Sequence, residues 1–126
     1  VPASRVVFAT ESGRKPTLIG KKIIDPILFD PFSTKLDSRD MQRLKTVTQK
    51  LKGEAGTLLV TGFVKYVGAS KAVMVKIATE RAKAVTKFLA SLGIKVKIAY
   101  AGFGPHTTLN PNSSDRRVEL RWAPGQ

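Results

Sequence analysis

The sequence predicts an α/β two-layer sandwich, with two helices packed on one face of a mixed β-sheet, in the order strand, helix, strand, helix, strand, loop, strand. Three observations support this prediction. A long segment with helical periodicity, residues 70–92, ends at a glycine. Strand-like runs lie on either side of that segment, at residues 57–64 and 95–100. A run of alternating residues, 117–122, follows a long polar loop.

The chain of 126 residues suits one domain, which we place at residues 25–123. Residues 1–24 are expected to be an N-terminal arm or an edge strand. The apolar run Arg5–Ala9 is compatible with a short strand, and residues 17–24 allow an edge strand or a hairpin. An arm leading in from a neighbouring domain fits the same residues equally well. Residues 124–126 are expected to be a tail.

The first helix should follow a short strand. Residues 27–29 are apolar and lie between Pro26 and Pro31, and proline lacks the N–H that a central strand needs, so this strand belongs near an edge. Asp37 or Ser38 can cap the helix that follows. A buried stripe is predicted at helical spacing by Met41, Leu44, Val47 and Leu51.

The second helix should lie between two strands. Residues 57–64 are rich in Val, Leu, Thr and Phe and predict a strand. Ser70 is a plausible N-cap, and Gly93 stands where a left-handed residue would end the helix. One face of this helix collects Ala78, Ala82, Val85, Leu89 and Leu92.

The last two strands both alternate. Residues 95–100 alternate lysine with apolar residues, which predicts a strand with one solvent-facing side. The polar loop at residues 102–115 is long, and long loops in compact domains are often functional. Residues 117–122 then place Val118, Leu120 and Trp122 on one side and Arg117, Glu119 and Arg121 on the other.

The composition narrows the classes of partner. The chain holds 22 Lys and Arg against 9 Asp and Glu, a net charge of +13, which attracts nucleic acid, anionic lipid or acidic cell-wall polymers. It holds no cysteine, so disulfides and zinc–thiolate sites are excluded. No apolar run approaches the ~20 residues of a membrane span, and no signal peptide is visible. We expect no cofactor and no metal, because the single histidine, His106, has no cluster of other ligands around it.

Six short motifs occur one after another along the chain. They are LFDPFSTKL at 28–36, GFVKYVG at 62–68, IATERA at 77–82, LASLGI at 89–94, GFG at 102–104 and DRRVE at 115–119. In this order and spacing, residues 27–120 resemble the OmpA-like C-terminal domain, the peptidoglycan-associating module of bacterial envelope proteins. The resemblance implies a β-α-β-α-β-β fold, a non-catalytic binding function and a place in the cell envelope or outside the cytoplasm.

The resemblance also implies a ligand site. In that family an aspartate after the second strand holds the ammonium group of diaminopimelate, and an arginine on the second helix holds its carboxylate. The arginine position is Arg81, but the aspartate position falls on Lys65. Two like charges about 4 Å apart repel by roughly 1 kcal/mol in water and by more in a pocket. Phe63 and Val64 replace the family's His and Thr, so we expect an acidic ligand or none.

Two roles stay open for Arg81. Its guanidinium could clamp a carboxylate or phosphate in a bidentate fork. Alternatively, it could be a structural arginine paired with Glu119 or with loop carbonyls. Lys65 could be a second anion contact beside it, although a solvated loop charge is the commoner role of such a lysine.

Three more residues complete the set of candidate ligand-binding residues. Tyr66 could offer a stacking surface near the cleft. Of Arg116 and Arg117, the resemblance implies that one braces the site and the other faces solvent. A basic stripe, which is usually only a solvated face, is formed by Lys76, Lys83, Lys87, Lys95 and Lys97.

Two classes of function follow from these residues. The first is a non-catalytic module that associates an exported or surface protein of a bacterium with peptidoglycan or another anionic cell-wall component. The second is a structural or protein-interaction domain, with an acidic protein partner, that keeps the fold but has lost peptidoglycan binding. No nucleophile, base and orienting group occur at a plausible spacing, so we expect no enzyme. Specific nucleic-acid binding is not expected, because aromatic residues are not interleaved with the basic ones.

Overall fold

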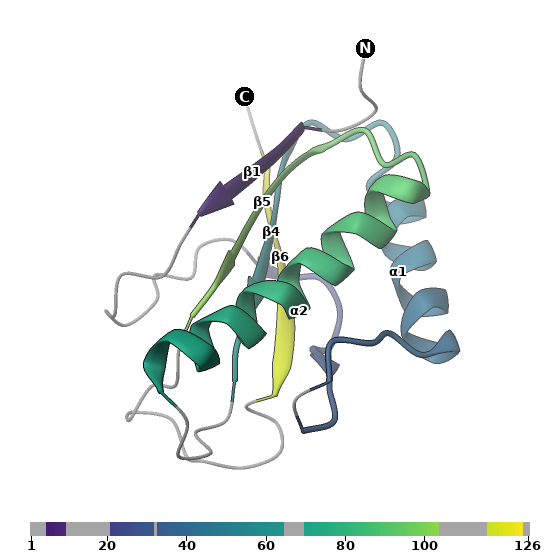
Figure 1. The fold of residues 1–126 in the computed structure, drawn as a ribbon. Helices are drawn as coiled ribbons and strands as arrows, with labels where there is room; N and C mark the ends of the chain where they lie inside the picture. The colour runs from purple at the N-terminus through teal and green to yellow at the C-terminus, as the bar shows by residue number, and fades with distance from the viewer. Residues whose placement is uncertain (1–4, 10–20, 32, 65–69, 104–115, 125–126) are drawn as a thin grey trace.

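The computed structural model of the chain describes residues 5–9, 21–31, 33–64, 70–103 and 116–124 (Figure 1). Lys65, Tyr66 and His106 lie outside these residues. The elements are β1 (Arg5–Ala9), β2 (Lys21–Lys22), β3 (Ile27–Leu28), α1 (Ser38–Lys50), β4 (Gly56–Gly62), α2 (Lys71–Ser91), β5 (Lys97–Gly102) and β6 (Arg117–Pro124).

The strands form one mixed sheet in the order β1-β5-β4-β6-β2, and β3 also pairs with β6. β4 lies in the middle, parallel to β5 and antiparallel to β6. A right-handed crossover through a helix is the usual way to join parallel neighbours, and α2 joins β4 to β5 here. Because β4 and β5 run parallel, both end at the same edge of the sheet, and the candidate site lies there.

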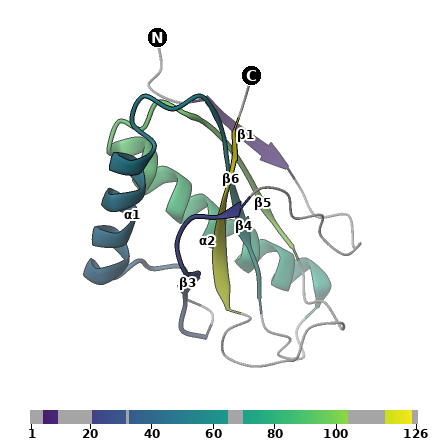
Figure 2. The same cartoon turned by 180° about the vertical axis from the view of Figure 1, so that it is seen from behind.

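Both helices cover the same face of the sheet, as Figures 1 and 2 show from opposite sides. Apolar side chains of both helices and of the sheet form one buried cluster between the two layers. This arrangement confirms the predicted two-layer sandwich. The cluster contains Leu44, Val47, Val85, Leu89, Leu58, Val60, Ile98, Val118 and Leu120 among its members.

Helix α1 begins with a capping box. The Asp37 carboxylate accepts from the Asp40 N–H at 2.7 Å, and the Asp40 carboxylate accepts from the Asp37 N–H at 3.3 Å. Asp40 is buried, and burial raises its pKa above the ordinary value of 3.8. The predicted buried stripe of this helix is wrong at one position, because Met41 is 36% exposed. The cap turns Asp40 inward and leaves Met41 facing solvent.

Helix α2 begins and ends where the sequence predicts. The Ser70 hydroxyl accepts from the Val73 N–H at 3.3 Å, and Gly93 has φ +78° just after the helix. The helix lies directly on the ends of β4 and β5. A Cβ at Gly62 would stand 1.9 Å from the Ala78 carbonyl oxygen, and one at Gly102 would stand 2.2 Å from the Thr79 nitrogen. Two glycines therefore allow the approach that places Arg81 over the sheet edge.

The two strands nearest the N-terminus, β1 and β2, are the outer strands of the sheet. β1 pairs in parallel with β5, with Arg5 opposite Lys97, and β2 pairs antiparallel with β6. The Ile23 N–H also donates to the Leu120 carbonyl at 3.3 Å. A strand at Arg5–Ala9 agrees with the sequence, whereas the division of the chain at residue 24 stays a prediction.

Candidate functional site

The candidate site lies where α2 crosses the ends of the parallel strands. The Arg81 guanidinium is fully buried and donates from all three of its nitrogen atoms. Nε donates to the Ser33 carbonyl at 2.8 Å, one terminal nitrogen to Phe63 at 3.1 Å and the other to Asp30 at 3.1 Å. One side chain thus joins α2, the end of β4 and the segment between β3 and α1.

A second guanidinium lies close to the first. The Arg116 Nε donates to the Phe29 carbonyl at 3.1 Å, and the Arg81 guanidinium lies 5.4 Å from the centre of the Phe29 ring. Burial, with a smaller contribution from the positive charge of Arg116, lowers the pKa of Arg81 to about 10. We call Arg81, Arg116 and the carbonyl groups that they hold the arginine site.

No carboxylate in the described part of the chain forms a salt bridge with the arginine site. Glu119 is buried, but it pairs with Arg117 at 2.9 Å and with Arg121 at 3.3 Å. Of the two structural partners expected for Arg81, the structure therefore shows the loop carbonyls and not Glu119. Two neighbouring cations held mainly by neutral acceptors keep their net positive charge, so the arginine site favours an anion.

Apolar side chains fill the end of β4 beside the arginine site. Phe63 is only 2% exposed, and the Arg117 guanidinium lies 4.0 Å from the centre of its ring. The Phe103 ring stacks on Phe63 with centroids 6.1 Å apart. Val64 is buried in a small cluster with Met74 and Ala78 of α2. The resemblance implies His and Thr at positions 63 and 64, whereas this chain has buried apolar side chains at both.

The structure brings together some of the candidate residues. Arg81, Arg116 and Arg117 all lie around the sheet edge, through their contacts with Phe29 and Phe63. The positions of Lys65 and Tyr66 relative to them lie outside the described residues. Sequence reasoning missed Asp30 and Ser33, which bind Arg81 through backbone carbonyls, because any residue type could supply those carbonyls.

Two further features are absent from the described residues. Within them, no three His, Asp or Glu side chains come together as a metal ion would require. Among the same residues, no helix is long and apolar enough to cross a membrane. Positive charge and guanidinium N–H groups are the features of the arginine site that suit an anion.

Comparison with solved structures gives several similar folds at low sequence identity. The C-terminal domain of MotB from Helicobacter pylori is 21% identical, with a TM-score of 0.66 over 81% of this chain and 86% of that one. The peptidoglycan-associated lipoprotein from Burkholderia pseudomallei is 19% identical, with a TM-score of 0.61 over 78% of this chain and 89% of that one. The OmpA-like domain of FopA1 from Francisella tularensis is 18% identical, with a TM-score of 0.60 over 80% of this chain and 74% of that one.

The curated protein sequences contain no match to this chain. A family model does match, and it covers residues 28–121, which run from β3 into β6 and include the whole arginine site. By this match and by its fold, the chain belongs to the OmpA family.

Proposed function

We propose that this chain is a non-catalytic binding module of the bacterial cell envelope. It would associate an exported or surface protein with peptidoglycan or another anionic cell-wall component. OmpA-like domains are non-catalytic peptidoglycan-binding modules of the periplasm and cell envelope. The observation that carries the proposal is the arginine site, where Arg81 and Arg116 lie together without a carboxylate partner among the described residues.

The proposed ligand group is a carboxylate. Guanidinium binds carboxylate through charge-assisted hydrogen bonds, which are about twice as strong as neutral ones. Three nitrogen atoms of Arg81 already donate to carbonyls, so Arg116 is the better placed of the two to contact a ligand. Lys65, at the position where the family has an aspartate, would disfavour the ammonium group of diaminopimelate and favour a ligand whose nearby groups are acidic or neutral.

Retention on insoluble peptidoglycan tests this proposal. Arg116→Gln should weaken binding about tenfold or more, because one charge-assisted hydrogen bond is worth roughly 1.5–3 kcal/mol. The matched control is Arg39→Gln, which removes the same charge from an exposed position on α1. Equal retention of the two variants would count against the arginine site as the ligand site.

A second pair of variants tests the part played by Lys65. Lys65→Asp restores the family's charge, and it should raise retention on diaminopimelate-type peptidoglycan. Lys45→Asp makes the same change of charge at an exposed position on α1 and should not raise it. An equal effect of the two changes would assign the result to net charge alone.

The second candidate function is a domain that keeps the fold without binding peptidoglycan. Two observations favour it. Arg81 is fully buried and donates to carbonyls from all three of its nitrogen atoms, and Phe63 and Val64 are apolar and buried beside it. An acidic partner protein would then meet the basic surface. This reading predicts that wild-type retention on peptidoglycan disappears at moderate salt.

A further inference from the structure

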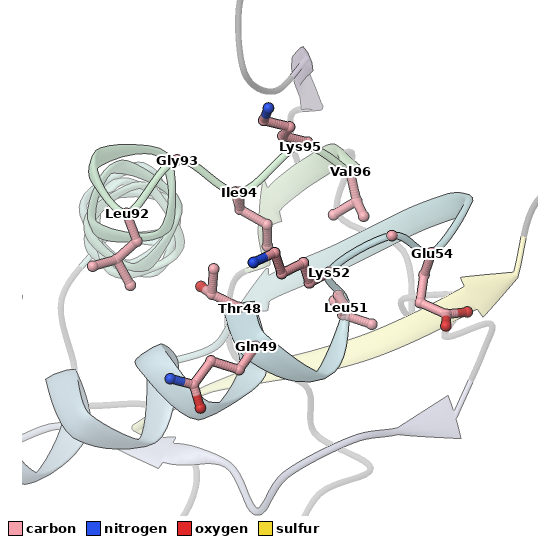
Figure 3. Close-up of a pocket in the computed structure, with 11 residues that line it drawn as sticks. Thr48, Gln49, Leu51, Lys52, Glu54, Leu92, Gly93, Ile94, Lys95 and Val96 are labelled. Atoms are coloured by element: carbon pink, nitrogen blue, oxygen red, sulfur yellow. The ribbon is translucent and has the colours of Figure 1, made fainter.

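A groove lies at the end of the helical layer opposite the arginine site. It runs between the C-terminal ends of α1 and α2 and has a volume of about 490 Å³ (Figure 3). The α2 end of the groove begins at Leu92, which is 11 residues and therefore about 17 Å along the helix axis from Arg81. The lining residues are Thr48, Gln49, Leu51, Lys52, Gly53, Glu54, Leu92, Gly93, Ile94, Lys95 and Val96.

The floor of the groove is apolar. Leu51, Ile94 and Val96 are buried members of the main core, and Leu92 is half-buried at the edge. Several carbonyls of the last helical turns accept bonds from the turns that follow. Val47 accepts from the Leu51 N–H, and Leu89 accepts from the Ile94 N–H. The polarity of the groove therefore comes mainly from the side chains at its rim.

One cation reaches over this apolar floor. In Figure 3 the Lys52 side chain runs across the groove toward Thr48 and Ile94, while the Glu54 carboxylate points away from them. Within the described residues, the Lys52 ammonium has no ion pair or hydrogen bond. A cation after a helix C-terminus is favourable in itself, which accounts for the lysine. It does not account for the groove that the lysine crosses.

We propose that this groove is a second ligand site, which takes a small amphiphilic carboxylate. An aliphatic chain would lie on the floor made by Leu51, Leu92 and Ile94, and its carboxylate would accept a hydrogen bond from the Lys52 ammonium. The volume falls within the ~300–1,000 Å³ of small-molecule sites, which are mostly apolar with few polar groups. The charge of Lys52 selects an acid over a neutral or cationic chain of equal length. The site is separate from the arginine site and does not depend on the function proposed for it.

Titration of ¹⁵N-labelled protein with decanoate, below the concentration at which it forms micelles, tests the proposal. Saturable shifts are expected at the amide signals of residues 48–54 and 92–96 and not at the arginine site. Decanol should bind about fivefold more weakly, because it keeps the chain but lacks the charge. Acetate, which has the charge without the chain, should cause no shifts.

The variant pair Lys52→Gln and Lys50→Gln makes the test specific. Both residues are exposed lysines near the C-terminal end of α1, but only Lys52 lines the groove. Lys52→Gln should weaken decanoate binding about fivefold and Lys50→Gln should leave it unchanged. Equal affinities of the two variants, shifts spread over the whole chain, or no binding of decanoate would overturn the proposal. The proposal would also be overturned if a short acidic peptide that contains leucine binds and decanoate does not. The groove would then be a protein-docking surface.

Discussion

The guanidinium of Arg81 reaches carbonyls in segments that are far apart in the sequence. Its bonds to Asp30 and Ser33 span 51 and 48 residues, and its bond to Phe63 spans 18. The fork of an arginine can hold three such acceptors at fixed angles, whereas a lysine ammonium is a compact point charge on a flexible stem. At the scale of the residue, Arg81 therefore shapes the sheet edge whether or not it also touches a ligand.

Arg81→Lys should lower the free energy of unfolding by about 2–4 kcal/mol, because each buried carbonyl left without a donor costs roughly 1–3 kcal/mol. Urea denaturation followed by circular dichroism measures this change. Lys87→Arg, at an exposed position on the same helix, should change stability by no more than about 0.5 kcal/mol. A loss for Arg81→Lys no larger than that of the control would show that the three bonds contribute little.

At the scale of the element, α2 packs closely on the ends of β4 and β5 because Gly62 and Gly102 have no side chains to hold it away. Gly62→Ala should lower the free energy of unfolding by about 2 kcal/mol or more, because a Cβ there overlaps the Ala78 carbonyl oxygen and the helix backbone must move. Thr57→Ala, at a half-buried position of the same strand, serves as the control and should cost about 1 kcal/mol or less. Thermal unfolding compares the two, and a Gly62→Ala protein as stable as the control would contradict the close packing.

The capping box of α1 gives a prediction that depends on pH. The folded-state pKa of Asp40 is raised above 3.8, so the folded state holds this proton more tightly than the unfolded state does. Stability from this group therefore rises as pH falls through the range just above 3.8. Asp40→Asn removes the ionisation and can still accept from the Asp37 N–H, so its stability relative to wild type should be greatest at neutral pH.

Urea denaturation of Asp40→Asn and wild type, at several values between neutral pH and about pH 4, measures this dependence. Asp25→Asn, at an exposed position before β3, is the control for the loss of one carboxylate. An advantage of Asp40→Asn that widens as the pH falls would contradict the raised pKa.

At the scale of the whole molecule, the sequence predicted the layers better than the site. The N-cap residue Ser70 and the left-handed Gly93 mark α2 within the chain itself, because caps act through local backbone geometry. The exposure of Met41 follows from the capping box, which periodicity alone does not include. An edge strand within residues 17–24 is one of the expected alternatives, but its pairing of Lys21–Lys22 with β6 involves residues distant in sequence. The acceptors of Arg81 are backbone atoms, which no residue pattern reveals.

The net charge of +13 also acts on the molecule as a whole. It should cause weak, non-specific retention on any polyanion, and that retention should fall steeply between about 0.1 M and 0.5 M salt as charges are screened. Retention on peptidoglycan that depends on the arginine site should persist in the same range, because partly buried pairs are screened less. Parallel binding to a polyphosphate resin and to insoluble peptidoglycan compares the two. If retention on the resin and retention on peptidoglycan are lost at the same salt concentration, the second candidate function is favoured, a domain that keeps the fold without binding peptidoglycan.

We propose that the arginine site binds a carboxylate of the cell wall. Titration of ¹⁵N-labelled protein with a soluble disaccharide-peptide fragment of peptidoglycan is the decisive test. We predict saturable shifts at the amide signals of Asp30, Phe63 and Arg116, with those of the groove at residues 48–54 and 92–96 unchanged. The absence of saturable shifts around Arg116, or their appearance only elsewhere on the molecule, would contradict the claim.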